Sequence, residues 1–234
     1  KSRNCAKFER MYPDDKRPKI GSITTGLPQY QYGLRDYYIK SAYNAAATGE
    51  LTNTFVSICA LKKVIDQGAR FLDFEIYTLD GEPVVAVSNT KRFGIKGSYN
   101  SLPFSECMEA VENHAFSGGK CPNPNDPLIL HFRVKSKNND IYDKMAAALH
   151  SSVGKRTLGR TFSNESNGLN LARLPLSEFA GKVIIVVDRS NKRYQHSALD
   201  EFVNLASNSA FMRTLRNYDV EFAHDYKELI RYNK

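Results

Sequence analysis

The sequence lacks long hydrophobic runs, internal repeats, and linkers rich in Gly, Ser or Pro. No purely apolar run is longer than Val183–Val187, whereas a membrane-spanning helix needs about 20 apolar residues. No signal-peptide pattern is present, but the chain begins at Lys1 rather than Met, which leaves open an upstream signal or anchor. With 234 residues, 41% of them apolar, the chain can build one sizeable core, and we expect one main domain.

The sequence also lacks zinc-ligand spacing, an RNA-binding signature and a DNA-reading helix, which disfavours nucleic acid as a partner. Its formal charge is nevertheless +8, from 33 Lys+Arg against 25 Asp+Glu. This balance favours contact with anionic lipid or acidic protein, and the alternative is a solvated surface with a basic tail. The basic residues are densest at Lys1, Arg3, Lys7, Arg10, Lys16, Arg17, Lys19, Lys155, Arg156 and Arg160.

Only four cysteines are present, and they form neither a CxxC motif nor a metal-binding spacing. Cys59 falls on the apolar face of an expected helix, which predicts a small buried side chain. Cys107 and Cys121 flank another expected helix and its exit loop, so either a bridge between them or two free thiols fits the pattern. The cysteines therefore leave the redox compartment undetermined.

Residues 1–34 are rich in Pro, Gly, Lys and Asp, which predicts a basic, irregular N-terminal arm. Residues 35–234 form the main domain and alternate between strand and helix patterns. Expected strands cover residues 36–42, 70–79, 83–88, 127–134, 182–188 and, in the tail, 211–222. Expected helices cover residues 52–69, 105–116, 140–153 and 199–207, and Gly68 is the expected C-cap of the first.

This alternation predicts an α/β fold with a mostly parallel sheet and helices outside it. In such folds ligands bind beyond the carboxyl ends of the strands, where the chain turns back into a helix. The candidate site residues are therefore those at the strand ends. They are Tyr43, Asn44, Asp73, Glu75, His131, Arg133, Val186 and Asp188.

Four stretches resemble the X region of phosphatidylinositol-specific phospholipase C, and they occur in that family's order over roughly residues 35–190. They are the loop SAYNAAATGE (41–50), the segment ALKKVIDQGARFLDFEIYTLDGEPVVAVSNT (60–90), the strand DPLILHFRVKS (126–136) and the segment LPLSEFAGKVIIVVD (174–188). The resemblance implies a fold similar to the TIM barrel of the PLC-like phosphodiesterases.

The family's chemistry uses two imidazoles, one to take a proton from the inositol 2-hydroxyl and one to protonate the leaving alcohol. The resemblance places these groups at Tyr43 and Val87. A phenol with a pKa near about 10 is a poor base at neutral pH, and a valine carries no proton at all. The lysines that read phosphate and inositol in the family correspond to Val186 and Asp188. The resemblance therefore implies a site without its proton carriers.

The calcium ligands of the family correspond to Asn44, Asp73, Glu75 and Arg133. Calcium needs about six to eight oxygen ligands, and a guanidinium would repel it, so we expect neither a metal nor another cofactor. Arg133 is expected to pair with Asp73 or Glu75 instead, because a buried charge needs a partner. Bacterial members of the family use an arginine in place of the metal, so Arg133 alone does not exclude activity.

His131 lies two positions before Arg133 and therefore faces the same side of its strand. Two interpretations stay open: a hydrogen-bonded core histidine, which is the commoner case, or a replacement base in a rearranged active site. We adopt the first and expect a catalytically inactive phospholipase C-like domain that acts in structural assembly or binding, with a protein partner or by self-assembly.

The alternatives are an active phosphodiesterase with a rearranged site and a peripheral module that binds anionic lipid headgroups through its basic arm. Degenerate domains of this kind are also encoded by large DNA viruses, so family analogy adds a structural role in a virion to the expectations.

Too few residues follow Asp188 for the four further strand–helix units of a complete barrel, which has about 250 residues. The tail predicts one helix and one or two strands. We therefore expect an incomplete or distorted barrel. Its edges would be covered by the terminal arms, or completed by another chain or by sequence beyond Lys234, because open edges invite association.

Overall fold

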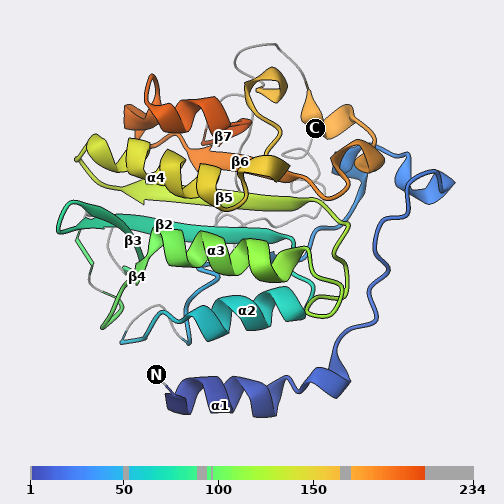
Figure 1. Cartoon of the computed structure of the whole chain (residues 1–234), viewed down its shortest axis with the longest axis horizontal. Helices are drawn as coiled ribbons and strands as arrows, with labels where there is room; N and C mark the ends of the chain where they lie inside the picture. The colour runs from blue at the N-terminus through green and yellow to red at the C-terminus, as the bar shows by residue number, and fades with distance from the viewer. Residues whose placement is uncertain (1, 50–52, 89–93, 96, 164–169, 209–234) are drawn as a thin grey trace, which may run out of the picture.

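A computed structural model describes residues 2–49, 53–88, 94–95, 97–163 and 170–208. One seven-stranded sheet forms its centre, with the order β4-β3-β2-β5-β6-β7, and β1 also pairs with β2 (Figure 1). The strands are β1 (Ser41–Ala42), β2 (Phe71–Leu79), β3 (Glu82–Ala86), β4 (Leu102–Pro103), β5 (Leu128–Lys135), β6 (Val183–Asp188) and β7 (Leu205–Ser207).

Four α-helices accompany the sheet in the part of the chain that the structure describes: α1 (Ser2–Met11), α2 (Ile58–Asp66), α3 (Phe104–Ala115) and α4 (Asp140–Ser151). Figure 1 shows α2, α3 and α4 on one side of the sheet, with α1 outside them next to α2. None of the described helices has the length and apolar character needed to cross a membrane. Short 3-10 helices occupy Asp14–Lys16, Pro28–Tyr30, Leu34–Asp36, Gly154–Arg156, Arg160–Phe162, Leu171–Arg173, Leu176–Phe179, Lys192–Tyr194 and Ala198–Phe202.

Strands β2, β5, β6 and β7 run parallel, and β3 and β4 add an antiparallel end to the sheet. Among the described residues, β4 and β7 lie at opposite ends of the strand order and no pairing joins them. The sheet is therefore an open part of a barrel. This confirms the expectation of an α/β fold with an incomplete barrel.

The two faces of the sheet carry different partners because side chains alternate along each strand. Leu72 and Phe74 of β2, with Leu130 and Phe132 of β5, are fully buried in the core beneath the helices. Burying a side chain of this size stabilises the fold by about 1.5–3 kcal/mol. The residues between them point to the other face, which is where the charged side chains of β2 and β5 lie.

The second face is covered near the strand starts by the N-terminal arm and by the segment around residues 171–179. Ile23 and Leu34 of the arm are buried against Ile129 and Ile184 of the sheet. Backbone hydrogen bonds join the two covering segments, from Leu34 to Leu174 at 3.0 Å and from Leu176 to Tyr32 at 2.9 Å. The arm is thus part of the folded domain.

Several sequence expectations need correction. The arm was expected to be irregular, but its residues Ser2–Met11 form α1. The helix expected over residues 52–69 begins only at Ile58, because Val56 is held extended by the Asn100 side chain and Ser57 caps the helix. The strand expected over residues 36–42 is limited to β1.

The helix expected over residues 199–207 is a 3-10 turn followed by β7. Asn204 explains the change, since its buried amide accepts from the Ile185 N–H at 2.9 Å and donates to the Gly159 carbonyl at 3.0 Å. These bonds fix an extended segment beside β6. The strand expected over residues 211–222 lies outside the described residues.

The cysteine expectations also change. Cys59 is joined to Cys5 by a disulfide and is only half-buried, so it is not the small core residue that the sequence predicted. Cys107 and Cys121 are both buried free thiols, so the structure has no bridge between them. The one disulfide of the described residues therefore links α1 to the start of α2.

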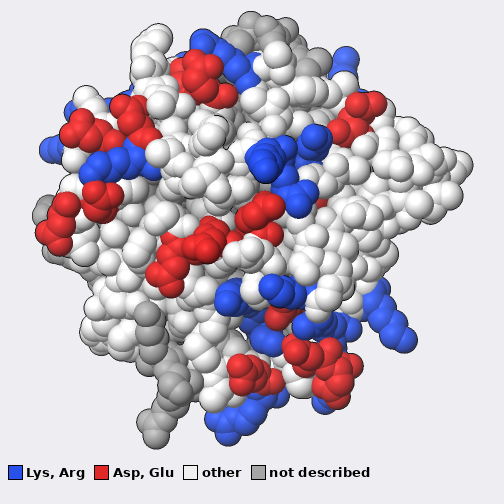
Figure 2. Space-filling model, viewed as in Figure 1, with Lys and Arg blue, Asp and Glu red and all other residues white. Residues whose placement is uncertain are grey.

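Charge on the helical side of the molecule is mixed. On the face seen in Figure 2, Lys and Arg side chains are interspersed with Asp and Glu instead of forming one basic patch. Two of the basic residues that the sequence analysis noted are paired with acids: Arg156 with Glu112 at 3.0 Å and Arg160 with Glu201 at 2.6 Å.

Candidate functional site

The candidate site lies on the second face of the sheet, near the middle of β2 and β5 and not beyond their carboxyl ends, where the sequence analysis placed it. The loop after β1 brings Asn44 to this face, and its backbone N–H donates to Asp73 at 3.1 Å. Asn44 has a φ of 46°, a left-handed conformation that asparagine tolerates better than most residues. In the parallel register Asp73 is opposite His131, and Glu75 is opposite Arg133. Five of the predicted residues therefore meet.

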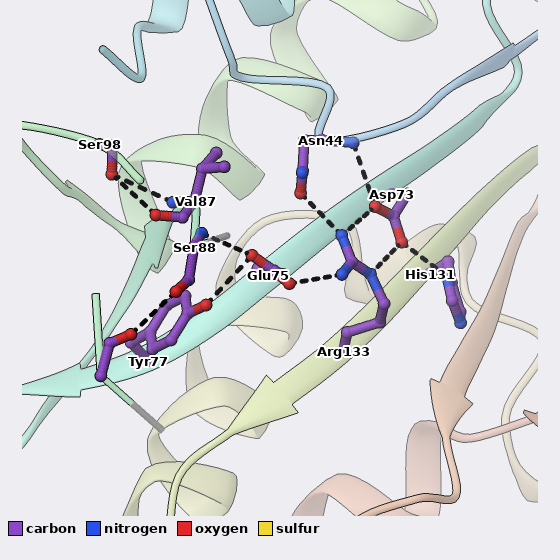
Figure 3. Close-up of polar contacts among 10 residues, drawn as sticks. Asn44, Asp73, Glu75, Tyr77, Val87, Ser88, Ser98, His131 and Arg133 are labelled. Atoms are coloured by element: carbon purple, nitrogen blue, oxygen red, sulfur yellow. Dashed lines mark hydrogen bonds and ion pairs between the residues drawn. The ribbon is translucent and has the colours of Figure 1, made fainter. Parts of the chain in front are cut away.

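Arg133 is the centre of this group, which we call the charge cluster (Asn44, Asp73, Glu75, His131 and Arg133; Figure 3). Its guanidinium donates to both carboxylate oxygens of Asp73, from Nε at 2.9 Å and from Nη2 at 2.7 Å. Nη1 donates to Glu75 at 2.5 Å, and Nη2 also donates to the Asn44 side-chain oxygen at 2.7 Å. The ion pairs expected for Arg133 are both present.

All carboxylate oxygens of the charge cluster accept hydrogen bonds from the protein. Besides Arg133, Asp73 accepts from His131 Nδ1 at 2.7 Å. The second oxygen of Glu75 accepts from the Tyr77 hydroxyl at 3.1 Å and from the Ser88 N–H at 3.0 Å (Figure 3). The two carboxylates are buried, and their acceptor positions are occupied by donors of the chain.

The electrostatics of the charge cluster favour its ionised form. Burial alone would raise the pKa of Asp73, but hydrogen bonds from His131 and Arg133 and the charge of Arg133 lower it to about 2. Burial also disfavours the charged guanidinium of Arg133, yet the hydrogen bonds and charge of Asp73, with the charge of Glu75, raise its pKa. Both charges are therefore retained because they neutralise each other.

Tyr43 covers the charge cluster with its uncharged aromatic ring. Its ring centre lies 4.5 Å from the guanidinium carbon of Arg133, a cation–π contact. Burial raises the pKa of the Tyr43 phenol, and the charge of Arg133 opposes this only in part. A phenol with a raised pKa is ionised even less at neutral pH, so less phenolate is present to take a proton.

His131 connects the charge cluster to β7. Its Nδ1 contacts Asp73, and its Nε2 lies 2.7 Å from the hydroxyl of Ser207. This Ser–His–Asp order resembles that of a catalytic triad. Two features separate it from one: Arg133 already neutralises Asp73, and Ser207 is fully buried with an exposed fraction of 0%. The arrangement is therefore a buried hydrogen-bonded link between strands.

Comparison with known proteins identifies the family. A family model described as phosphatidylinositol-specific phospholipase C, X domain, matches residues 30–189, which is more than half of the chain. The chain belongs to this family. No curated protein sequence matches the chain.

Solved structures similar to this X domain include PLC21 of S. officinalis and PLC21 of L. pealei, each 14% identical with a TM-score of 0.59. The matches cover 88% and 99% of this chain but only 26% and 32% of those chains. The X domain described here thus spans between about a quarter and a third of the length of these structures. At this identity the likeness shows the fold alone.

The residues of this X domain do not fit the calcium ion that the family resemblance implies. Its four ligand positions hold Asn44, Asp73, Glu75 and Arg133, and Arg133 donates to oxygens of the other three. A metal would have to displace the guanidinium and the other donors before it reached a free oxygen. Among the described residues, no group of three or more His, Cys, Asp or Glu could hold a metal ion.

The remaining predicted residues lie around the cluster. Val87 is buried and lines a small pocket together with Asn44, Asp73 and Glu75, so the structure brings it to the same site. Asp188 ends β6, and its carboxylate accepts from the Ser190 N–H at 2.8 Å and from the Asn208 side chain at 2.9 Å. Val186 is buried in the apolar cluster beneath the arm.

Sequence reasoning missed three residues that contact the cluster: Tyr77, Ser88 and Ser207. Tyr77 could have been found, because it follows Glu75 by two positions and so shares its face of β2. Ser88 lies beside Val87 after β3 and contacts Glu75 through its backbone, which no side-chain pattern reveals. Ser207 fell within an expected helix, so its alignment with His131 had no signal in the sequence.

Proposed function

We propose that this X domain is catalytically inactive toward phosphoinositides and acts through binding or assembly. One observation carries the proposal: a guanidinium fills the place of the implied metal, and neither position of the two implied imidazoles holds a group that can move a proton at neutral pH. Arg133 bonds to Asn44, Asp73 and Glu75, while Tyr43 and Val87 stand at the imidazole positions.

The missing imidazoles matter more than the missing metal. Val87 has no ionisable group, and it is buried in the core at 1% exposure. Tyr43 has a raised pKa and directs its ring face toward Arg133. A positioned general acid or base typically contributes about 10²- to 10⁴-fold to a rate. Losing both groups would therefore remove most of the catalysis that such a site provides.

A second candidate, an active phosphodiesterase with a rearranged site, is favoured by His131. This histidine lies within hydrogen-bond distance of Asp73, as a general base with its orienting carboxylate would. Both its ring nitrogens are engaged, however, and the residue is only 6% exposed. A substrate would reach it only if β7 moved away with Ser207.

An assay of phosphatidylinositol hydrolysis, with calcium and with a chelator, separates these two candidates. We expect no turnover above the buffer background in either condition. The same assay on His131→Ala is the control for the second candidate. Turnover in the unaltered protein that disappears in His131→Ala would overturn the proposal of inactivity and establish the rearranged site.

The open sheet supports a role in assembly. In the described residues β4, at one end of the strand order, pairs only with β3. Unpaired strand edges offer backbone donors and acceptors to another chain. We propose a second copy or a protein partner as the occupant of such an edge. Sedimentation over a hundredfold range of concentration tests self-association, and a constant monomer mass would exclude the second copy.

A further inference from the structure

Helix α1 is attached to the domain in an unusual way. None of its residues from Cys5 to Met11 is buried, and Met11 is 55% exposed. The helix packs on the outside of α2, as Figure 1 shows. Its covalent attachment is the disulfide between Cys5 and Cys59, which joins residues 54 positions apart. Little apolar burial therefore holds α1 in place besides this bond.

The segment after α1 has its own attachment. Lys63 of α2 donates to the Tyr12 carbonyl at 3.1 Å and pairs with Asp14 at 3.3 Å. Arg17 donates to the Gly119 carbonyl at 2.9 Å. These contacts fix residues 12–17 independently of the sulfur atoms. Loss of the disulfide would therefore free α1 itself and leave the following segment docked.

The surroundings of Cys59 suit a bond that opens easily. Ser57 is the N-cap of α2, so Cys59 lies in the first turn, where the helix dipole favours a thiolate. The Ser57 hydroxyl lies 3.1 Å from the Cys59 sulfur and can donate to it. Lys62 follows Cys59 by three positions and so lies on the same side of the helix. Each of these features stabilises Cys59 as a leaving group.

We propose that the Cys5–Cys59 disulfide is a reversible redox clamp that decides whether α1 is docked or released. A dithiol reductant attacks the Cys5 sulfur as a thiolate, the S–S bond breaks, and Cys59 leaves as the thiolate. The second thiol of the reductant then displaces Cys5 and closes the reductant's own disulfide. Two electrons pass to the protein, and the two protons of the dithiol are matched by those taken up on Cys5 and Cys59.

Release changes the state of α1 because the helix is too short to persist alone. Isolated helices shorter than about 12–15 residues are marginal in water, and α1 has 10 residues. We therefore expect residues 2–11 to become an extended, basic segment after reduction. We expect the sheet and its helical layer to stay folded, because no residue from Cys5 to Met11 is buried against them.

Thiol labelling tests whether the bond exists and opens under native conditions. The folded protein is treated with iodoacetamide before and after dithiothreitol, and labelled sites are read by mass spectrometry. We expect no label before reduction, and labels on Cys5 and Cys59 only after it. Cys107 and Cys121 are the internal controls, because both are buried free thiols. Labelling of Cys5 and Cys59 without reductant, or no labelling after it, would overturn the clamp.

Limited trypsin digestion tests the release of α1. Reduction should speed cleavage after Lys7 and Arg10 by at least about tenfold, because a locally open segment is cut without global unfolding. Cys5→Ser should show the same fast cleavage without reductant. Ala6→Ser is the matched control, since it makes a similar change at an exposed neighbour and keeps the disulfide. Equal cleavage rates in the oxidised protein, the reduced protein and Cys5→Ser would show that the bond does not hold α1.

Discussion

The ring of Tyr43 lies 4.5 Å from the guanidinium carbon of Arg133 and covers it on the side of the solvent. Tyr43 is 59% exposed, whereas the Arg133 side chain is 12% exposed. At the position where the family resemblance places an imidazole, this chain has an aromatic face that stabilises a cation. Tyr43 thus stands where the resemblance implies a proton-transferring imidazole, and it stabilises the charge cluster instead.

Replacing Tyr43 by Ala should lower the free energy of unfolding by about 1–2 kcal/mol, which is the size of a partly desolvated cation–π contact. Tyr43→Phe keeps the ring and should lose less than half of that amount. Urea unfolding of the three proteins measures both effects. Equal stability of Tyr43→Ala and the unaltered protein would show that the ring contributes nothing to the cluster.

Arg133→Met should destabilise the fold by about 3–5 kcal/mol, because it leaves Asp73 and Glu75 buried without a cation. The same urea measurement applies. Arg160→Met is the matched control, since Arg160 pairs with Glu201 on the exposed surface, where such pairs contribute about 0–1 kcal/mol. Similar losses for the two variants would contradict a buried, coupled cluster.

Much of the cluster could be predicted from alternation along two strands. Asp73 and Glu75 had to share one face of β2, and His131 and Arg133 one face of β5. Adjacent parallel strands then bring the two faces together, and the structure pairs Arg133 with both acids. The prediction of these shared faces needed only the positions of the two strands. Short apolar runs flanked by turn residues indicated those positions.

Contacts between distant segments could not be predicted in the same way. Cys5 and Cys59 are separated by 54 positions, and no local pattern indicates which cysteines meet. Ser207 reaches His131 only because Asn204 turns an expected helix into a strand beside β6. Local propensity favoured a helix there, but two hydrogen bonds of the buried Asn204 side chain fix an extended segment instead.

Acid should destabilise the protein through Asp73. Its pKa in the folded state is about 2, below the ordinary value of 3.8, so its contribution is complete above pH 3.8 and is lost as the pH falls toward 2. At about 1.4 kcal/mol for each pKa unit, the contribution is ~2 kcal/mol. Urea unfolding at several pH values between 5 and 2 measures the loss.

Asp73→Asn should be less stable than the unaltered protein at pH 5 and should lose less stability on acidification. Asp15→Asn is the control, because Asp15 is an exposed residue of the arm and its removal should leave the pH dependence unchanged. If Asp73→Asn lost as much stability between pH 5 and 2 as the unaltered protein, another carboxylate would be responsible for the acid sensitivity.

Calcium should not stabilise the unaltered protein, but it should stabilise Arg133→Glu. In the unaltered protein the oxygens of Asp73 and Glu75 face Arg133 and other donors of the chain, so a cation finds no free ligand. In Arg133→Glu, three carboxylates and the Asn44 oxygen would surround one point, which suits calcium's preference for oxygen ligands.

Without metal, Arg133→Glu should melt well below the unaltered protein, because like charges then face one another in a buried site. Calcium at about 100 times its dissociation constant should restore about 2.7 kcal/mol, and the melting temperature should rise with calcium concentration. Magnesium should restore less, since it requires a tighter octahedral geometry. Should Arg133→Glu fail to fold without metal, refolding in calcium and then in chelator gives the same comparison. A calcium-dependent rise in the melting temperature of the unaltered protein would show that its carboxylates are open to metal and that Arg133 does not close the site.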